Sequence, residues 1–271
     1  MFFLILEMLC QTECLCYSTA MVQYFFADSS LTQILVLGLC AFLIGANKMG
    51  VPAIGILPVI LLALVFPAKL SPGIQLILLA ATDVLAVIYY RRHANWKIIL
   101  RLLPFALVGI ALGSIVIRTV DNEMLLLRMM GVLILALVIL NLFRERLKSY
   151  LADKGLILAL FFGVALGFAT QLANAAGPIA AMYFVLMRLQ KEEYMGVSAW
   201  TFLLLNCIKL PIFISEGRIT MEALRMDIAI FPLVLVGGIC GVLFLKKVPQ
   251  KRFEQLVEIL VFLSALYLCF K

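Results

Sequence analysis

Charged residues are scarce in this chain of 271 residues: Asp, Glu, Lys and Arg make up 14% of it, whereas soluble domains keep about a quarter. Hydrophobic residues make up 65%, and the mean hydropathy is +1.14. They form successive runs of about 16 to 23 residues, the length that crosses a hydrocarbon layer about 30 Å thick. Charges gather between the runs, so the alternating pattern of a membrane β-barrel is lacking. The composition predicts an all-α integral membrane protein with several spans.

Histidine is almost absent, and the motifs of several protein classes are missing. His93, the single histidine, lies in the loop RRHANW, where a residue at headgroup level is more typical than a catalytic base. Cys14 and Cys16 are too closely spaced for a CxxC redox or zinc motif. No phosphate-binding G-x-x-x-x-G-K-[ST] sequence occurs, which argues against ATP-driven transport. We expect neither an enzyme nor a metal site or cofactor.

The N-terminal 30 residues lack the basic start of a signal peptide. They favour an interfacial helix or a weak extra span. The chain after them divides into a first repeat at 31–143 and a second at 155–271. A basic linker, RERLKSYLADK at 144–154, joins the two.

The apolar runs follow the same order in both halves. They cover 31–47, 51–66, 73–90, 97–117 and 123–143, and then 155–173, 178–189, 196–214, 225–245 and 252–270. An offset of 128 aligns WKIILRLLPFALVGIALG with LRMDIAIFPLVLVGGICG, matching one proline pair and two glycine pairs. An offset of 127 aligns Asn47 and Gly50 with Asn174 and Gly177. These matches indicate a duplication, which is common in transporters.

Lysine and arginine are unevenly distributed between the two sets of loops. Fourteen lie on one face, six on the other and two within the runs. The positive-inside rule predicts that the first face, which includes the linker, is cytoplasmic and that the C-terminus lies outside. Each half then crosses an odd number of times, so we predict two inverted-topology repeats. The two segments around each break either both span the membrane or turn back within it, so we expect a bundle of about eight to ten helices.

Two breaks rich in glycine and proline interrupt the apolar runs: GANKMGVP at 45–52 and TQLANAAGPIA at 170–180. A break inside a membrane frees backbone polar groups, which are tolerated only beside protein or a polar cavity. Pro52 and Pro178 favour new helix starts, whose N-terminal N–H groups attract anions. Lys48 adds a full positive charge. The breaks predict an anion site near the midplane, the alternative being kinked helices bridged by amides.

The run TFLLLNCIKLPIF at 201–213 carries a third group of polar residues. Asn206 and Lys209 are three residues apart and share a helix face. Lys209 either supplies a second cation or extends to the membrane interface. Asp83 lies within run 73–90. An unpaired carboxylate at the bilayer centre would cost a few kcal/mol of insertion free energy. We expect Asp83 to pair with Lys48 or Lys209, the alternative being proton uptake during transport.

These motifs resemble the TauE/SafE sulfite exporter family from about residue 31 to the C-terminus. GANKMGVPAIGILP resembles the signature of its first half, and YYRRHANWKIILRLLP its central loop. GFATQLANAAGPIAAMYF followed by TFLLLNCIKLPIF resembles the signature of its second half. Many members have a run of glycines where this chain has ANKM at 46–49, so the bulkier side chains leave the substrate open.

The resemblance implies an inner-membrane carrier, in bacteria, of small sulfur anions such as sulfite, sulfoacetate or thiosulfate. It implies a site between the repeats that is exposed alternately to each side. An anion-selective channel, or a carrier of another small organic anion, is the alternative. The expected partners are this anion and the lipid bilayer, without nucleic acid, and homo-oligomers are left open. The predicted substrate-binding residues are Asn47, Lys48, Gly50, Val51, Thr170, Gln171, Asn174, Gly177, Asn206 and Lys209.

Overall fold

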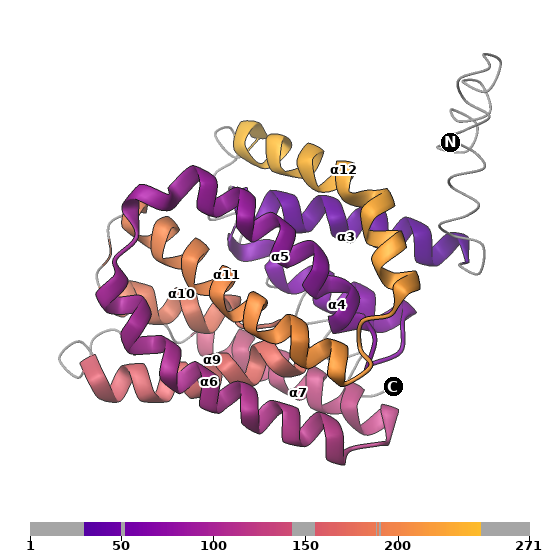
Figure 1. Ribbon diagram of the computed structural model, residues 1–271, viewed down its shortest axis with the longest axis horizontal. Helices are drawn as coiled ribbons and strands as arrows, with labels where there is room; N and C mark the ends of the chain where they lie inside the picture. Colours follow the sequence, from indigo (N-terminus) through magenta and orange to yellow (C-terminus); the bar gives the residue numbers. More distant parts are fainter. Residues whose placement is uncertain (1–29, 50–51, 143–154, 188, 190, 245–271) are drawn as a thin grey trace.

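The computed structural model describes residues 30–49, 52–142, 155–187, 189 and 191–244 (Figure 1). The predicted N-terminal segment before residue 30, the linker and the last run at 252–270 lie outside the described residues. All elements in the described part of the chain are helices. The first half contains α3 (Leu31–Met49), η1 (Pro52–Ile56), α4 (Leu57–Val65), α5 (Ser71–Tyr90), η2 (Arg91–His93), α6 (Trp96–Thr119) and α7 (Glu123–Leu142). The second half contains α9 (Gly155–Ala173), α10 (Gly177–Leu186), α11 (Lys191–Ser215) and α12 (Met221–Phe244).

Five of the described helices are long and apolar enough to cross a membrane: α3, α5, α6, α11 and α12. The prediction of a polytopic helical membrane protein is therefore confirmed. Both breaks fall where the sequence places them, because α3 ends at Met49 and α9 ends at Ala173. Pro211 lies within α11, which continues beyond it to Ser215.

The segments around the first break fold back on one another. The Nε2 atom of Gln33, at the start of α3, donates to the carbonyl of Val65 at the end of α4, at 3.2 Å. The nine residues of α4 extend only about 14 Å along a helix axis. η1 and α4 together return the chain to the level at which α3 begins. After the second break, the ten residues of α10 pack against α9.

Two helix pairs join the halves through close backbone contacts. α3 packs on α12, and α6 packs on α9, as Figure 1 shows at opposite edges of the bundle. An added Cβ at Gly45 would lie 1.9 Å from the Val234 carbonyl oxygen, and one at Gly167 would lie 1.9 Å from the Ala106 carbonyl oxygen. Under the sequence offsets, α3 corresponds to α9 and α12 to α6. This pairing supports the duplication, while the inverted repeat stays a prediction.

Helices α5 and α11 pack against each other between these two pairs. Apolar clusters lie on either side: one joins α3, α5 and α12, and the other joins α6, α9, α10 and α11. Where α5 faces α11, a small apolar cluster of Ala86, Val87 and Ala199 is accompanied by polar side chains, with Asp83, Asn206 and Lys209 almost fully buried. The fold thus brings ionisable groups to the place where the two halves meet.

Candidate functional site

Lys48 and Asp83 form a buried ion pair between the first break and α5. Lys48 lies in the last turn of α3, and its ammonium contacts the Oδ1 atom of Asp83. The two side chains are 12% and 0% exposed. Asn206 of α11 donates to the other carboxylate oxygen at 2.6 Å, and the Phe202 ring lies 4.3 Å below the Lys48 ammonium. Asp83 therefore pairs with Lys48, one of the two partners that the sequence leaves open.

Lys209 lies on the same face of α11 as Asn206 and is fully buried. Its ammonium donates to Thr170 Oγ1 at 2.8 Å, to Asn174 Oδ1 at 2.5 Å and to Asn206 Oδ1 at 3.2 Å. This burial contradicts the alternative in which Lys209 extends to the interface. The three acceptors are neutral, so they solvate the ammonium without cancelling its charge.

Asn174 connects this lysine to the second break. It follows the end of α9 with a φ of 52°, in the left-handed region that asparagine adopts more readily than most residues. Its backbone N–H donates to the Thr170 carbonyl at 3.0 Å, and its Nδ2 donates to the Pro72 carbonyl at the start of α5 at 2.7 Å. The break thus positions one side chain between α11 and α5.

Together these contacts form one network, which we call the lysine network. Its members come from α3, α5, α9 and α11: Lys48, Asp83, Thr170, Asn174, Asn206 and Lys209. The network holds two ammonium groups and the carboxylate of Asp83, which pairs with Lys48, so it carries a surplus of one positive charge. Insertion scales assign each such charge about 2.5–3.5 kcal/mol at the bilayer centre. A bound monovalent anion would cancel the surplus.

A small cavity adjoins the lysine network. It measures ≈ 20 Å³ and is lined by Lys48, Asp83, Ala86, Tyr90, Met195, Ser198, Ala199 and Phe202. A cavity of this size holds about one water molecule. An oxyanion with three or more heavy atoms therefore needs the helices to separate before it enters.

Among the described residues, the other members of the predicted set lie outside the lysine network. Asn47 packs against Gly55, and its buried Oδ1 has no hydrogen-bond partner within the described ranges. Gly177 is exposed at the start of α10. Gly50 and Val51 lie outside the described residues. The structure thus brings together five of the ten predicted substrate-binding residues: Lys48, Thr170, Asn174, Asn206 and Lys209.

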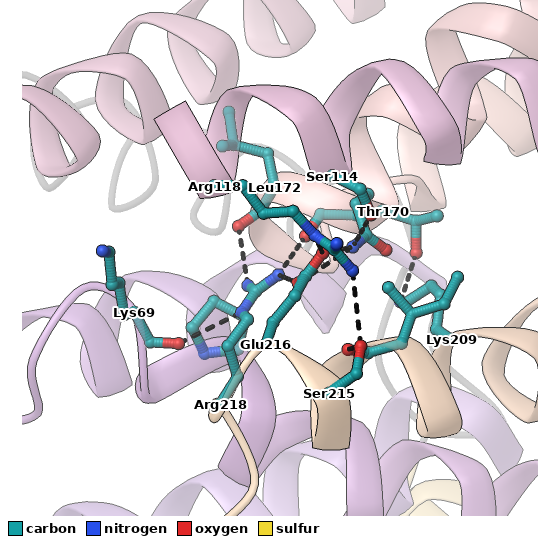
Figure 2. A network of polar contacts seen from close by, with 12 residues as sticks. Lys69, Ser114, Arg118, Thr170, Leu172, Lys209, Ser215, Glu216 and Arg218 are labelled. Carbon is teal, nitrogen blue, oxygen red and sulfur yellow. Dashed lines mark hydrogen bonds and ion pairs between the residues drawn. The ribbon is translucent and has the colours of Figure 1, made fainter. Parts of the chain in front are cut away.

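Gln171, the remaining predicted residue, contacts a different group of charged residues. Figure 2 labels Arg118, Glu216 and Arg218 of this group. The Nε2 atom of Gln171 donates to Ser114 Oγ at 2.8 Å and to the two oxygens of Glu216 at 3.2 and 3.3 Å. Two arginines complete this group, which we call the Glu216 cluster: Ser114, Arg118, Gln171, Glu216 and Arg218.

Sequence reasoning missed Glu216 and Arg218. Both belong to SEGR, the short loop between α11 and α12, where charges usually face water. Asp227 of α12 was also missed: it is buried, and neither carboxylate oxygen has a hydrogen-bond partner among the described residues. A charged residue inside or directly beside a long apolar run is costly to place in a membrane. This position in the sequence could have indicated Glu216, Arg218 and Asp227.

The long apolar helices are those of a multi-pass membrane protein. The family model described as Sulfite exporter TauE/SafE matches residues 34–268. The chain therefore belongs to the TauE/SafE sulfite exporter family, which confirms the resemblance of its motifs and makes it a membrane anion exporter in general terms. No curated protein and no solved structure matches the chain.

Proposed function

We propose that this protein is a secondary transporter that exports small sulfur-containing anions, such as sulfite, sulfoacetate or thiosulfate, across a bacterial inner membrane. The observation that carries the proposal is the pair of buried lysines: Lys48 is paired with Asp83, and Lys209 contacts only neutral acceptors among the described residues, with Asn206 linking the two groups. In this proposal the basic loops face the cytoplasm, as the positive-inside rule predicts.

The anion binds between the two lysines. Thr170, Asn174 and Asn206 now accept hydrogen bonds from Lys209. Oxyanion oxygens replace these acceptors and place a negative charge against the ammonium, which none of the three neutral acceptors supplies. The Thr170 hydroxyl and the second N–H of each amide then donate to the anion, since the first N–H of Asn174 donates to Pro72 and that of Asn206 to Asp83. Asp83 already accepts from Lys48 and Asn206, which favours an ion-pair role for it over proton uptake.

The size of the cavity favours a carrier over an open channel. The space beside Lys48 measures ≈ 20 Å³, so an oxyanion passes only when helices move. Rocking of one half against the other opens the site to each side in turn. Contacts between the two halves break and reform in this step, including those of α5 with α11, α3 with α12 and α6 with α9.

Counterflow in proteoliposomes tests this function. Vesicles are loaded with sulfite, thiosulfate, sulfoacetate or acetate, and uptake of labelled anion is followed at increasing concentrations. We expect saturating uptake that is accelerated by unlabelled sulfur anion inside, and its loss in Lys209→Ala. Lys97→Ala, at the exposed start of α6, is the matched control. Flux that rises linearly without counterflow would identify a channel, and inactivity toward every anion would refute the proposed function.

A further inference from the structure

The carboxylate of Glu216 is surrounded by donors from three elements (Figure 2). Glu216 lies in the turn after α11, and its side chain is 1% exposed. Gln171 of α9 donates to it at 3.2 and 3.3 Å, Arg218 Nη1 lies 3.5 Å from Oε2, and Arg118 Nε of α6 lies 3.7 Å from Oε1. These contacts are longer than the 2.7–2.9 Å or so of a tight charge-assisted bond.

Arg218 is held in place independently of that carboxylate. Its guanidinium donates to the carbonyls of Lys69 at 3.1 Å, Gln171 at 2.8 Å and Leu172 at 3.3 Å. The last two belong to the end of α9, where backbone carbonyls lack partners within the helix. The Phe213 ring lies 3.7 Å from the guanidinium carbon. Arg218 therefore stays in position when the carboxylate leaves.

The cluster carries surplus positive charge that is reachable from solvent. Burial lowers the pKa of Arg218 to about 10, and Glu216 opposes this shift, so the guanidinium remains charged at neutral pH. Two guanidiniums thus face one carboxylate. The Arg118 side chain is 61% exposed, and Gln171 already has a nearer acceptor in Ser114 at 2.8 Å. The Glu216 carboxylate is therefore the member of the cluster that another anion can displace.

We propose that Glu216 is a tethered anion that occupies a second anion-binding site, formed by Arg118, Gln171 and Arg218. A small oxyanion displaces the carboxylate and takes over its donors. Gly217, with a φ of 67°, forms the adjoining turn in a conformation that glycine adopts without strain. The inference deepens the proposed function, since the displacing ligand is the transported sulfur oxyanion.

The second site lies next to the lysine network. Thr170 and Gln171 are neighbours in α9: the first contacts Lys209 and the second contacts Glu216. Phe213 lies within 5.3 Å of the Lys209 ammonium and 3.7 Å of the Arg218 guanidinium. An anion moving from Lys209 toward the α11–α12 loop therefore meets Arg118 and Arg218 next, with Glu216 as its competitor.

Charge-selective modification of a cysteine at position 216 tests the site without relying on transport. Glu216→Cys and Glu222→Cys, the latter exposed in the first turn of α12, are each treated with methanethiosulfonates carrying a sulfonate or a quaternary ammonium. Mass spectrometry follows the peptide that contains the new cysteine, so native cysteines do not interfere. We expect the anionic reagent to be favoured about tenfold more at 216 than at 222, and sulfate to slow it only at 216. Equal preferences, or no effect of sulfate, would overturn the proposal.

A second measurement uses the isosteric change Glu216→Gln in proteoliposomes, with Glu222→Gln as control. Loss of the competing charge is expected to lower the KM for sulfite severalfold from the side of the α11–α12 loop and to leave the KM from the opposite side unchanged. An unchanged KM from both sides, or an equal change from both, would indicate that Glu216 is structural only. Inactivity of the wild type refutes the proposed function alone, since the modification assay still decides the second site.

Discussion

Lys209 places a buried cation within a largely apolar segment. A lysine near the end of a membrane helix commonly extends to the interface, and nothing within TFLLLNCIKLPIF distinguishes that role from a buried one. The structure buries Lys209 fully and surrounds it with neutral acceptors. Its charge is therefore solvated but uncompensated. This combination is suited to an anion that binds reversibly.

Asp83 and Asp227 provide a matched pair of buried carboxylates. Both oxygens of Asp83 accept hydrogen bonds, from Lys48 and Asn206, whereas those of Asp227 have no partner within the described ranges. We expect Asp83→Asn to lower the free energy of unfolding by about 3 kcal/mol, because it leaves a buried ammonium unpaired. Asp227→Asn should change it by less than about 1 kcal/mol. Unfolding in detergent measures both, and equal losses would contradict the different roles.

Asn174 combines a backbone role with a side-chain role, and two substitutions separate them. Asn174→Gly keeps the left-handed backbone but removes the contacts with Lys209 and Pro72. Asn174→Ala removes the same contacts and adds strain of about 1 kcal/mol. We expect both variants to weaken anion binding alike, and the alanine variant to be the less stable. Anion binding by the glycine variant that equals the wild type would exclude the side chain from the site.

At the scale of elements, the two broken helices were predictable and their partners were not. Glycine, proline and asparagine act on the local backbone, so the sequence places the breaks after α3 and α9 correctly. The pairing of Asp83 with Lys48 depends on the packing of α3 and α5, which no local pattern encodes. Glu216 and Arg218 were missed for the same reason, because their burial arises from α9 and the loop before α5.

The crossing of α6 and α9 depends on glycine at the contact. A Cβ added at Gly167 would lie 1.9 Å from the Ala106 carbonyl oxygen, whereas one added at Gly177 would meet nothing within 4 Å. We expect Gly167→Ala to lower the free energy of unfolding by about 1–3 kcal/mol, since the helices must separate. Gly177→Ala should leave it nearly unchanged. Comparable losses in thermal unfolding would show that α6 and α9 do not approach this closely.

At the scale of the whole molecule, the two halves are interlocked. α3 of the first half packs on α12 of the second, and α9 of the second packs on α6 of the first. The lysine network lies between these pairs and draws on both halves. An anion that binds there contacts both halves at once. In the proposed function its binding therefore biases their relative position, as the proposed alternating access requires.

The central claim is that one small sulfur oxyanion binds to the lysine network, and calorimetric titration of the purified protein tests it most directly. Sulfite, thiosulfate, sulfoacetate, sulfate and chloride are titrated into the wild type, Lys48→Ala, Lys209→Ala and the control Lys97→Ala. We predict that one sulfur anion binds tightly, and that each of the two site substitutions weakens it at least tenfold, which is about 1.4 kcal/mol. Binding of equal strength in all four proteins would contradict the claim.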